Sequence, residues 1–253
     1  MQSTASETES PAALRSGRER VLVVVPAHNE ERTITPVLER IRASAPGVDL
    51  VVVNDGSTDR TADMIRAAGE KQLVHPCNLG YGLAIQTGLK FALRERYDVV
   101  VTLDADGQHD PADVPRVVKA LDTESADLVI ASRFCGGRGY GSAFGRRLGQ
   151  MLFSYLCRVI IGRRIFDTTS GFKAMNMDAC RAVVDATFMD FHTETIVRLS
   201  LLGFRVSEIE TEVEERTHGR SMHTFFNAAK YPIKTVLLTI VAAVDALLAR
   251  RTK

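Results

Sequence analysis

Apolar and polar stretches alternate along the first hundred residues in a way that predicts alternating strands and helices. Short β-branched apolar runs at 21–25, 48–54 and 98–103 are typical of parallel strands that are buried on both faces. Between them, apolar residues recur at helical spacing over 33–43, 57–68 and 82–94, and a short strand is expected near Leu73. This order predicts an α/β fold with a Rossmann-like, mostly parallel sheet, right-handed crossovers and flanking helices.

The second half of the chain is less regular. Its pattern predicts strands at 127–132 and 204–213 and helices at 147–161 and 193–202. Over 225–250, apolar residues again repeat at helical spacing, with Lys234 and Asp245 on the opposite face and a basic end. No run reaches the ~20 apolar residues of a spanning helix. We therefore expect an amphipathic helix that lies on a membrane surface, or alternatively packs against the sheet or a partner subunit.

Composition divides the 253 residues into a polar tail over 1–17, one domain over 18–224 and the terminal helix over 225–253. The net charge of +1 gives no reason to expect nucleic acid as a partner. Four cysteines are too widely spaced for a zinc site or a disulfide framework: Cys77, Cys135, Cys157 and Cys180. The first ten residues lack the apolar core of a signal peptide, so we expect reduced thiols and a cytoplasmic location.

Polar clusters follow three of the predicted strands, at 26–30, 54–59 and 104–106. Because parallel strands end at the same edge of a sheet, these clusters are expected to share a cleft, although each alone also suits a turn. Neither the GxGxxG of a dinucleotide site nor the GxxxxGK[ST] of a P-loop is present. Hydride transfer from a dinucleotide and kinase-like chemistry therefore both lose support.

Asp104 and Asp106 form the most informative cluster, because they follow a buried strand and stand one residue apart. Two like charges at this spacing repel each other, and each is costly to remove from water. A divalent cation shared with substrate phosphates relieves both problems, and Mg²⁺ is usually held by few carboxylates in this manner. The pair therefore predicts a metal site.

Four segments resemble the family 2 glycosyltransferases of the GT-A fold: Val25-Pro26-Ala27-His28-Asn29-Glu30; Val53-Asn54-Asp55-Gly56-Ser57-Thr58-Asp59; Asn78-Leu79-Gly80 with Gly82, Ala84 and Gly88; and the DxD motif Asp104-Ala105-Asp106. Later segments are similar to the dolichyl/polyprenyl-phosphate sugar synthase branch: Ser132-Arg133-Phe134; Arg146-Arg147; Asp167-Thr168-Thr169-Ser170-Gly171-Phe172-Lys173; and Arg216-Thr217-His218-Gly219-Arg220-Ser221. The resemblance covers about 21–221, which is most of the chain.

On the donor side, the resemblance implies that a nucleotide diphosphate sugar, UDP- or GDP-linked, is the substrate. Asp55 would accept a hydrogen bond from the base, Glu30 would meet the ribose, and Pro26, Ala27 and Asn29 would complete the nucleotide site. Asp104 and Asp106 would hold Mg²⁺ or Mn²⁺ on the diphosphate with support from Gln108, since hard cations prefer oxygen ligands. His109 is expected to be structural or to lie behind the ligands, with metal ligation as the alternative.

On the acceptor side, the resemblance implies a lipid phosphate. Arg133, Arg147, Arg216 and Ser221 stand at the branch positions that receive it, and arginine forks suit phosphate oxygens. Surface solvation is the alternative for these arginines, and Arg146 is an alternative to Arg147. Met222 departs from the lysine that the branch usually has after Ser221. Arg220 or Lys230 is a candidate for the missing charge.

Asp190 and Glu194 lie where the family often places acidic residues near the sugar. Glu194 is expected to bind sugar hydroxyls, but either residue suits the general base that a hydroxyl acceptor needs.

These expectations together predict a metal-dependent inverting glycosyltransferase with Asp104, Asp106, Arg133 and Glu194 at its catalytic centre. It would transfer a sugar to polyprenyl phosphate on the cytoplasmic face of a membrane, as a peripheral protein with a membrane surface or a small membrane protein as partner. A saccharide or other hydroxyl acceptor is the alternative. A non-catalytic nucleotide-sugar-binding scaffold is the alternative from a different class.

Overall fold

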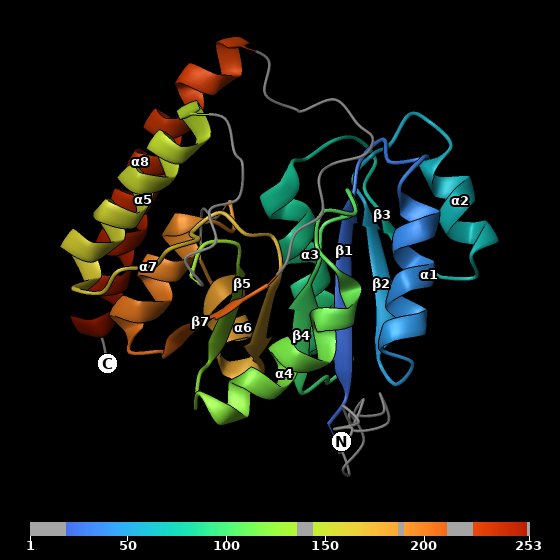
Figure 1. Cartoon of the computed structure of the whole chain (residues 1–253), viewed down its shortest axis with the longest axis horizontal. Helices are drawn as coiled ribbons and strands as arrows, with labels where there is room; N and C mark the ends of the chain where they lie inside the picture. The colour runs from blue at the N-terminus through green and yellow to red at the C-terminus, as the bar shows by residue number, and fades with distance from the viewer. Residues whose placement is uncertain (1–18, 136–143, 187–189, 212–224, 252–253) are drawn as a thin grey trace, which may run out of the picture.

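A seven-stranded sheet with helices on both faces forms the centre of the molecule (Figure 1). The computed structural model describes residues 19–135, 144–186, 190–211 and 225–251, without the side chains of 144–148, 225–231 and 251. The strands are β1 (Val21–Ala27), β2 (Asp49–Asn54), β3 (Lys71–Val74), β4 (Val99–Thr102), β5 (Leu128–Ser132), β6 (Lys173–Asn176) and β7 (Val206–Glu210). Their order in the sheet is β3-β2-β1-β4-β6-β5-β7.

The sheet is mostly parallel, as predicted. Only β6, among the described strands, runs against its neighbours β4 and β5. The carboxyl ends of the parallel strands therefore meet at one edge, and the first residues of β6 lie at that same edge. This arrangement adds residues from the second half of the chain to the edge where the polar clusters were expected.

The helices cover both faces of the sheet because successive strand residues point to opposite sides. They are α1 (Ile34–Ser44), α2 (Thr61–Ala67), α3 (Tyr81–Arg94), the short 3₁₀ helix η2 (Pro111–Asp113), α4 (Val114–Thr123), α5 (Phe144–Ile161), α6 (Met177–Val184), α7 (Thr193–Leu202) and α8 (Phe225–Arg251). Val23 and Val25 of β1 pack into one apolar core with α1 and α4. Leu22 and Val24 pack into a second core with α3, α6 and α7.

Close contact between α3 and β1 depends on Gly88. A Cβ atom at this position would lie 2.2 Å from Cγ1 of Val24, which is far inside van der Waals contact. The absence of a side chain therefore lets α3, and the loop that precedes it, approach the carboxyl end of β1.

Most of the predicted elements are confirmed within a few residues, and α7 matches its predicted bounds. Four elements, η2, α4, β6 and α6, were not predicted. The β6 segment consists of four residues that begin with lysine and end with asparagine, so it carries little of the β-branched signal of the other strands.

The predicted terminal helix is present as α8, and it packs against α7 and α5 (Figure 1). Its inward face is buried and carries small side chains, Thr235, Thr239, Ala242 and Ala246. Its outward face exposes large apolar side chains, among them Ile233 at 65% and Leu237 at 58%. The expectation of an amphipathic helix is confirmed in this sense.

We expected this helix to be too interrupted to cross a membrane. Judged by its length and composition, that expectation is wrong. Within the described residues, 232–250 is long and apolar enough to span a bilayer, and 28% of that segment is buried. The two charged side chains in the interior of this span are both paired with residues outside the helix: Lys234 with Asp190, and Asp245 with Arg198.

Candidate functional site

The clusters that follow β1 and β2 are joined directly by hydrogen bonds. The Asp55 backbone N–H donates to the Ala27 carbonyl oxygen at 2.8 Å. The Asn29 side-chain oxygen accepts from the Thr58 backbone N–H at 2.8 Å, and the Asn29 N–H donates to Ser57 Oγ at 3.0 Å. The structure thus brings these two predicted clusters together at the carboxyl edge of the sheet.

Asp55 is buried and holds the loop that leads into α3. Its carboxylate accepts hydrogen bonds from the Leu79 and Gly80 backbone N–H groups, both at 2.9 Å, and Nδ1 of His75 lies 2.7 Å from Oδ1. Burial would raise the pKa of Asp55, but these hydrogen bonds lower it below its ordinary value. These bonds account for much of its hydrogen-bonding capacity, and its contact with a base stays a prediction.

The other predicted nucleotide residues differ in exposure. Pro26 and Ala27 are buried in β1, whereas Asn29 is exposed and has a positive φ of 56°. Glu30 is half-buried, and its carboxylate accepts from the Thr33 hydroxyl at 2.5 Å. They flank the Asp55 loop, but their contacts with a nucleotide stay predictions.

Asp104 and Asp106 lie just beyond the end of β4 and are linked to the α3 loop. The Tyr81 hydroxyl donates to Asp104 Oδ1 at 3.0 Å, and the Asp106 carboxylate accepts from the Gln108 backbone N–H at 3.0 Å. Tyr81 follows Gly80, which donates to Asp55. Residues 79–81 therefore connect the Asp55 cluster with the carboxylate pair.

Gly171 packs directly against Asp104 from the other side. A Cβ atom at Gly171 would lie 2.0 Å from Oδ2 of Asp104. Burial and the neighbouring charge of Asp106 raise the pKa of Asp104 to about 6. This shift is the electrostatic cost that the sequence indicated for two adjacent carboxylates.

These residues fit a divalent cation, provided that the substrate supplies further ligands. The described residues contain no group of three or more His, Cys, Asp or Glu side chains placed to hold a metal ion. Two carboxylates completed by diphosphate and water oxygens are a usual Mg²⁺ site. Gln108 contributes its backbone N–H to Asp106, and a metal contact from its side chain stays a prediction.

His109 is buried against the edge of the Phe172 ring, with ring centroids 5.5 Å apart. Burial, followed by the charge of Arg133, lowers the pKa of His109 to about 4. His109 is therefore neutral at physiological pH. Its packing fits the structural role expected of it.

Arg133 follows β5 and is held by a partner that sequence reasoning did not assign. Its Nε and one terminal nitrogen donate to the two carboxylate oxygens of Asp167 at 2.7 and 2.8 Å, and the same terminal nitrogen donates to Thr169 at 3.0 Å. Burial would raise the pKa of Asp167, but the hydrogen bond and charge of Arg133 lower it. This fork orients Arg133, and its contact with an acceptor phosphate stays a prediction.

Glu194 is fully buried at the start of α7. One carboxylate oxygen accepts from the His192 backbone N–H at 2.8 Å. Burial, more than any other cause, raises the pKa of Glu194. Asp190 lies at the beginning of the same segment and pairs with Lys234 of α8 at 2.6 Å.

Lys173, the first residue of β6, lies fully buried in this cluster and was given no role in the sequence analysis. Burial lowers the pKa of Lys173 to about 8, while the carboxylates of Asp104, Asp167 and Glu194 act in the opposite direction. Lys173 ends the segment 167–173, which resembles the polyprenyl-phosphate branch, but a lysine usually indicates an exposed position.

Three predicted acceptor residues cannot be placed by side chain. Arg147 belongs to α5, but its side chain lies outside the described residues, as does that of Arg146. Arg216, Arg220, Ser221 and Met222 lie in 212–224, which is also outside them. Lys230 belongs to α8 without a described side chain. The chain enters 212–224 from β7, whose carboxyl end is at the site edge.

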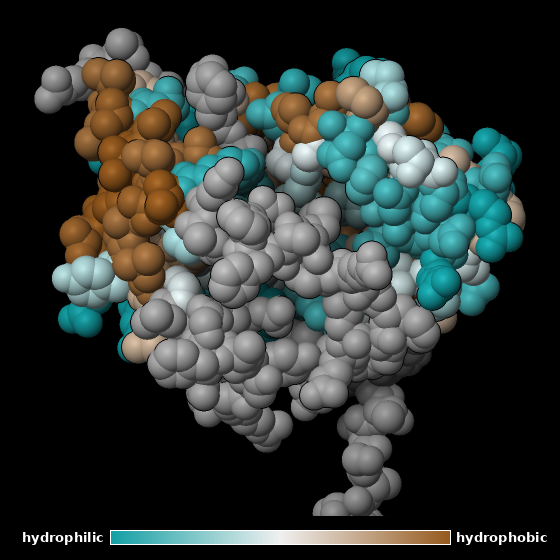
Figure 2. Space-filling model, turned by 90° about the horizontal axis from the view of Figure 1, so that it is seen from above, coloured by the Kyte–Doolittle hydropathy of each residue, from teal (hydrophilic) through white to brown (hydrophobic). Residues whose placement is uncertain are grey.

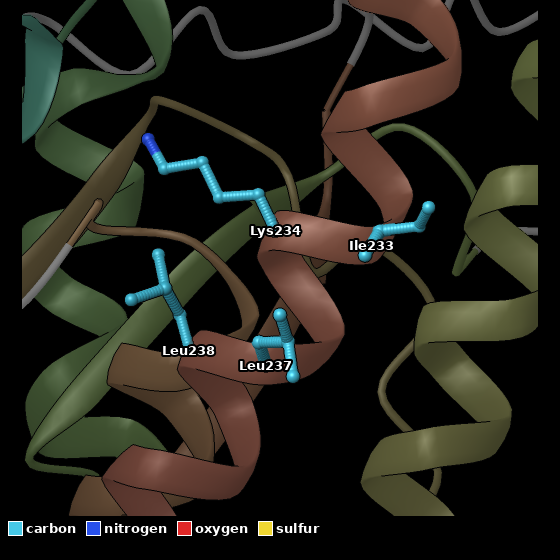
Figure 3. Close-up of a pocket in the computed structure, with 4 residues that line it drawn as sticks. All are labelled: Ile233, Lys234, Leu237 and Leu238. Atoms are coloured by element: carbon cyan, nitrogen blue, oxygen red, sulfur yellow. The ribbon is translucent and has the colours of Figure 1, made fainter.

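An open apolar recess of about 380 Å³ lies on the flank of α8 (Figure 3). Ile233, Leu237 and Leu238 line it together with Lys234. More broadly, apolar side chains gather on the side of the molecule formed by α5 and α8 (Figure 2). On α5 the exposed members are Met151, Leu152, Tyr155 and Val159.

Known proteins resemble this chain in sequence and in fold. The family model described as "Glycosyl transferase family 2" matches residues 22–184. An undecaprenyl-phosphate mannosyltransferase from Micrococcus luteus is 34% identical over 212 residues, which cover 80% of this chain and 86% of that protein. A polyprenol monophosphomannose synthase from Mycolicibacterium smegmatis is 32% identical over 225 residues, which cover 84% of each chain.

The fold is also similar to a solved structure, glucosyl-3-phosphoglycerate synthase from Mycobacterium tuberculosis in complex with Mn²⁺, UDP and phosphoglyceric acid. The TM-score is 0.68 at 22% identity, with 89% of this chain and 78% of that chain covered. At this level of identity the likeness concerns the fold, which is the GT-A fold that the sequence predicts.

Proposed function

Because the chain belongs to glycosyl transferase family 2, we propose that it transfers a sugar from a nucleotide diphosphate sugar to a polyprenyl phosphate. Two of the relatives with more than 30% identity are named for polyprenyl-phosphate mannosyl transfer. The transfer would invert the anomeric carbon, since the acceptor phosphate oxygen attacks it as the nucleoside diphosphate leaves. The observation that carries the proposal is the Asp104–Asp106 pair at the same sheet edge as the half-buried Arg133 fork.

The donor half of the site consists of the strand-end residues of β1, β2 and β4. Asp55 orders the backbone of 79–80, and Tyr81 orients the Asp104 carboxylate. Asp104 and Asp106 would hold Mg²⁺ or Mn²⁺ on the diphosphate, and the bound cation would stabilise the negative charge that develops on the leaving group. UDP- and GDP-linked sugars are both candidates for the donor.

The acceptor half draws on β5, β6 and the segment before α7. A phosphate acceptor is already anionic, so it needs cations for placement and no base for deprotonation. Arg133 is one such cation, held in place by Asp167. Arg147, Arg216 and Ser221 are proposed to complete the phosphate site on the basis of their sequence positions.

The hydroxyl-acceptor alternative has less support from the geometry. A general base must reach the substrate proton within hydrogen-bond distance. Glu194 is fully buried, and Asp190 is paired with Lys234. Neither carboxylate is therefore arranged as an accessible base. The scaffold alternative is disfavoured because the chain belongs to a family of enzymes.

The apolar side of α5 and α8 supports a peripheral position on the membrane, for which the cytoplasmic face is our proposal. The inward face of α8 is packed on α7 and fixed there by the Arg198–Asp245 ion pair at 2.8 Å. A helix held in this way presents its outer face to the bilayer surface, as interfacial helices do. A lipid acceptor is then delivered to the protein from the surface on which it docks.

Transfer from radiolabelled donor in the presence of membranes tests the proposal. UDP- and GDP-linked hexoses are supplied in parallel with Mn²⁺, and we expect label in an organic-extractable, acid-labile product with one of them. Asp106→Ala is the matched inactive control. Label in a water-soluble saccharide, with none in the lipid fraction, would contradict the lipid-phosphate acceptor.

A further inference from the structure

Lys173 is a fully buried lysine that lies between the two halves of the site. It begins β6 and is paired across the sheet with Thr102, the last residue of β4. Its side chain is 0% exposed. A lysine is almost never buried in this way unless its ammonium group has partners, because removing the charge from water is costly.

The ammonium group of Lys173 joins two segments that are distant in sequence. It donates to the carbonyl oxygen of Ser170 and, at 3.1 Å, to that of Phe191. It also lies 4.7 Å from the centroid of the Phe191 ring, within the range of a cation–π interaction. Residues 170–171 and 190–194 are therefore held by one side chain.

Both segments contact the environment of Asp104. Gly171, next to Ser170, packs against the Asp104 carboxylate. His192, next to Phe191, stacks on the Tyr81 ring at 5.4 Å, and Tyr81 donates its hydroxyl hydrogen to Asp104. The His192 N–H in turn donates to the carboxylate of Glu194. Lys173 therefore holds residues that lie next to the Asp104–Asp106 pair and also next to Glu194.

We propose that Lys173 is a positioning residue that holds the 190–194 segment, and with it Glu194, in register with the Asp104–Asp106 pair. This inference rests on the proposed function and on the expectation from the sequence that Glu194 binds sugar hydroxyls. Lys173 acts through the carbonyl groups that it binds, and it does not touch the donor. Its loss should therefore slow transfer more than it weakens the binding of donor and metal.

Lys173→Met is the principal test, because methionine fills a similar volume and donates no hydrogen bond. Lys173→Gln retains an amide donor that can reach one carbonyl, and it serves if the methionine variant does not fold. Ile65→Ala is the matched control, since it removes a fully buried side chain from α2, which packs on α1, β2 and β3. It destabilises the protein without contacting the segments that Lys173 joins.

Hydrogen exchange of the 190–196 amides is measured first, because it needs no substrate. We expect exchange at least about tenfold faster in Lys173→Met than in wild type and unchanged in Ile65→Ala. The turnover number is then expected to fall at least about thirtyfold, with the donor–Mn²⁺ dissociation constant within about threefold of wild type. Lys173→Gln should fall between wild type and Lys173→Met in both measurements.

Two outcomes would overturn the proposal. The first is unchanged exchange in a folded Lys173 variant, and the second is turnover within about threefold of wild type despite faster exchange. If wild type transfers no sugar to lipid phosphate, the proposed function fails, while the exchange measurement still decides whether Lys173 fixes the segment.

Discussion

Replacing Gly171 with alanine should disturb the proposed metal site through a single added carbon atom. The new Cβ would lie 2.0 Å from Oδ2 of Asp104, where ordinary contact requires about 3.5 Å. Relief of the overlap therefore moves the carboxylate by roughly 1.5 Å, or moves Gly171 and the neighbouring Ser170 that Lys173 binds. A displacement of about 1 Å in a catalytic group can reduce the rate about a hundredfold.

The assay compares Gly171→Ala with Gly149→Ala for turnover and for thermal unfolding with and without Mn²⁺. Gly149 lies in α5 with no atom within 4 Å of an added Cβ, so alanine there should leave activity intact and favour the helix. We expect Gly171→Ala to lose about a hundredfold in turnover and to lose most of its stabilisation by Mn²⁺. Wild-type turnover together with a wild-type response to Mn²⁺ would refute the argument that Gly171 sets the position of Asp104.

Three further predictions concern metal binding, packing and membrane contact. The pKa of Asp104 is raised to about 6 without metal, and a cation needs the ionised form. Stabilisation by Mn²⁺ should therefore be full above pH 7 and shrink as pH falls through about 6, and a thermal shift that is constant from pH 5 to 8 would contradict this. Gly88→Ala should lower the free energy of unfolding by about 1–3 kcal/mol in denaturant titrations, because its Cβ would lie 2.2 Å from Val24 Cγ1; unchanged stability would show that α3 shifts freely. Leu237→Glu should weaken co-sedimentation with anionic vesicles, whereas Val74→Glu, at a similarly exposed apolar position on β3, should not; equal binding by both variants would remove α8 from the membrane contact.

The donor half of the fold was predictable because its signals are local. Runs of β-branched residues predict β1, β2 and β4. The polar residues that follow these strands lie together at one edge of the sheet, because parallel strands end there. The carboxylates of Asp104 and Asp106 stand out in this context, since two charges after a buried strand need an explanation. Nothing beyond short-range pattern and strand order was required to bring them to one place.

The other half was less predictable because its organising contacts link residues far apart in the chain. Arg133 and Asp167 are separated by 34 positions, and their pairing decides how the arginine fork is oriented. From the sequence alone, Lys173 is expected at the surface, because the position of β6 between β4 and β5 cannot be predicted from local pattern. From the sequence alone, Lys234 and Asp245 are expected to interrupt an apolar helix, because their partners Asp190 and Arg198 are distant in the chain.

The antiparallel strand β6 has a consequence for how such enzymes diversify. Since β5 ends and β6 begins at the site edge, the whole connection between them, including α5, departs from and returns to the same side of the sheet. The length and composition of that connection can change without altering the register of β1, β2 and β4. The proposed contribution of Arg147 and the apolar surface of α5 can therefore change together, while the strands that carry Asp55 and the Asp104–Asp106 pair keep their register.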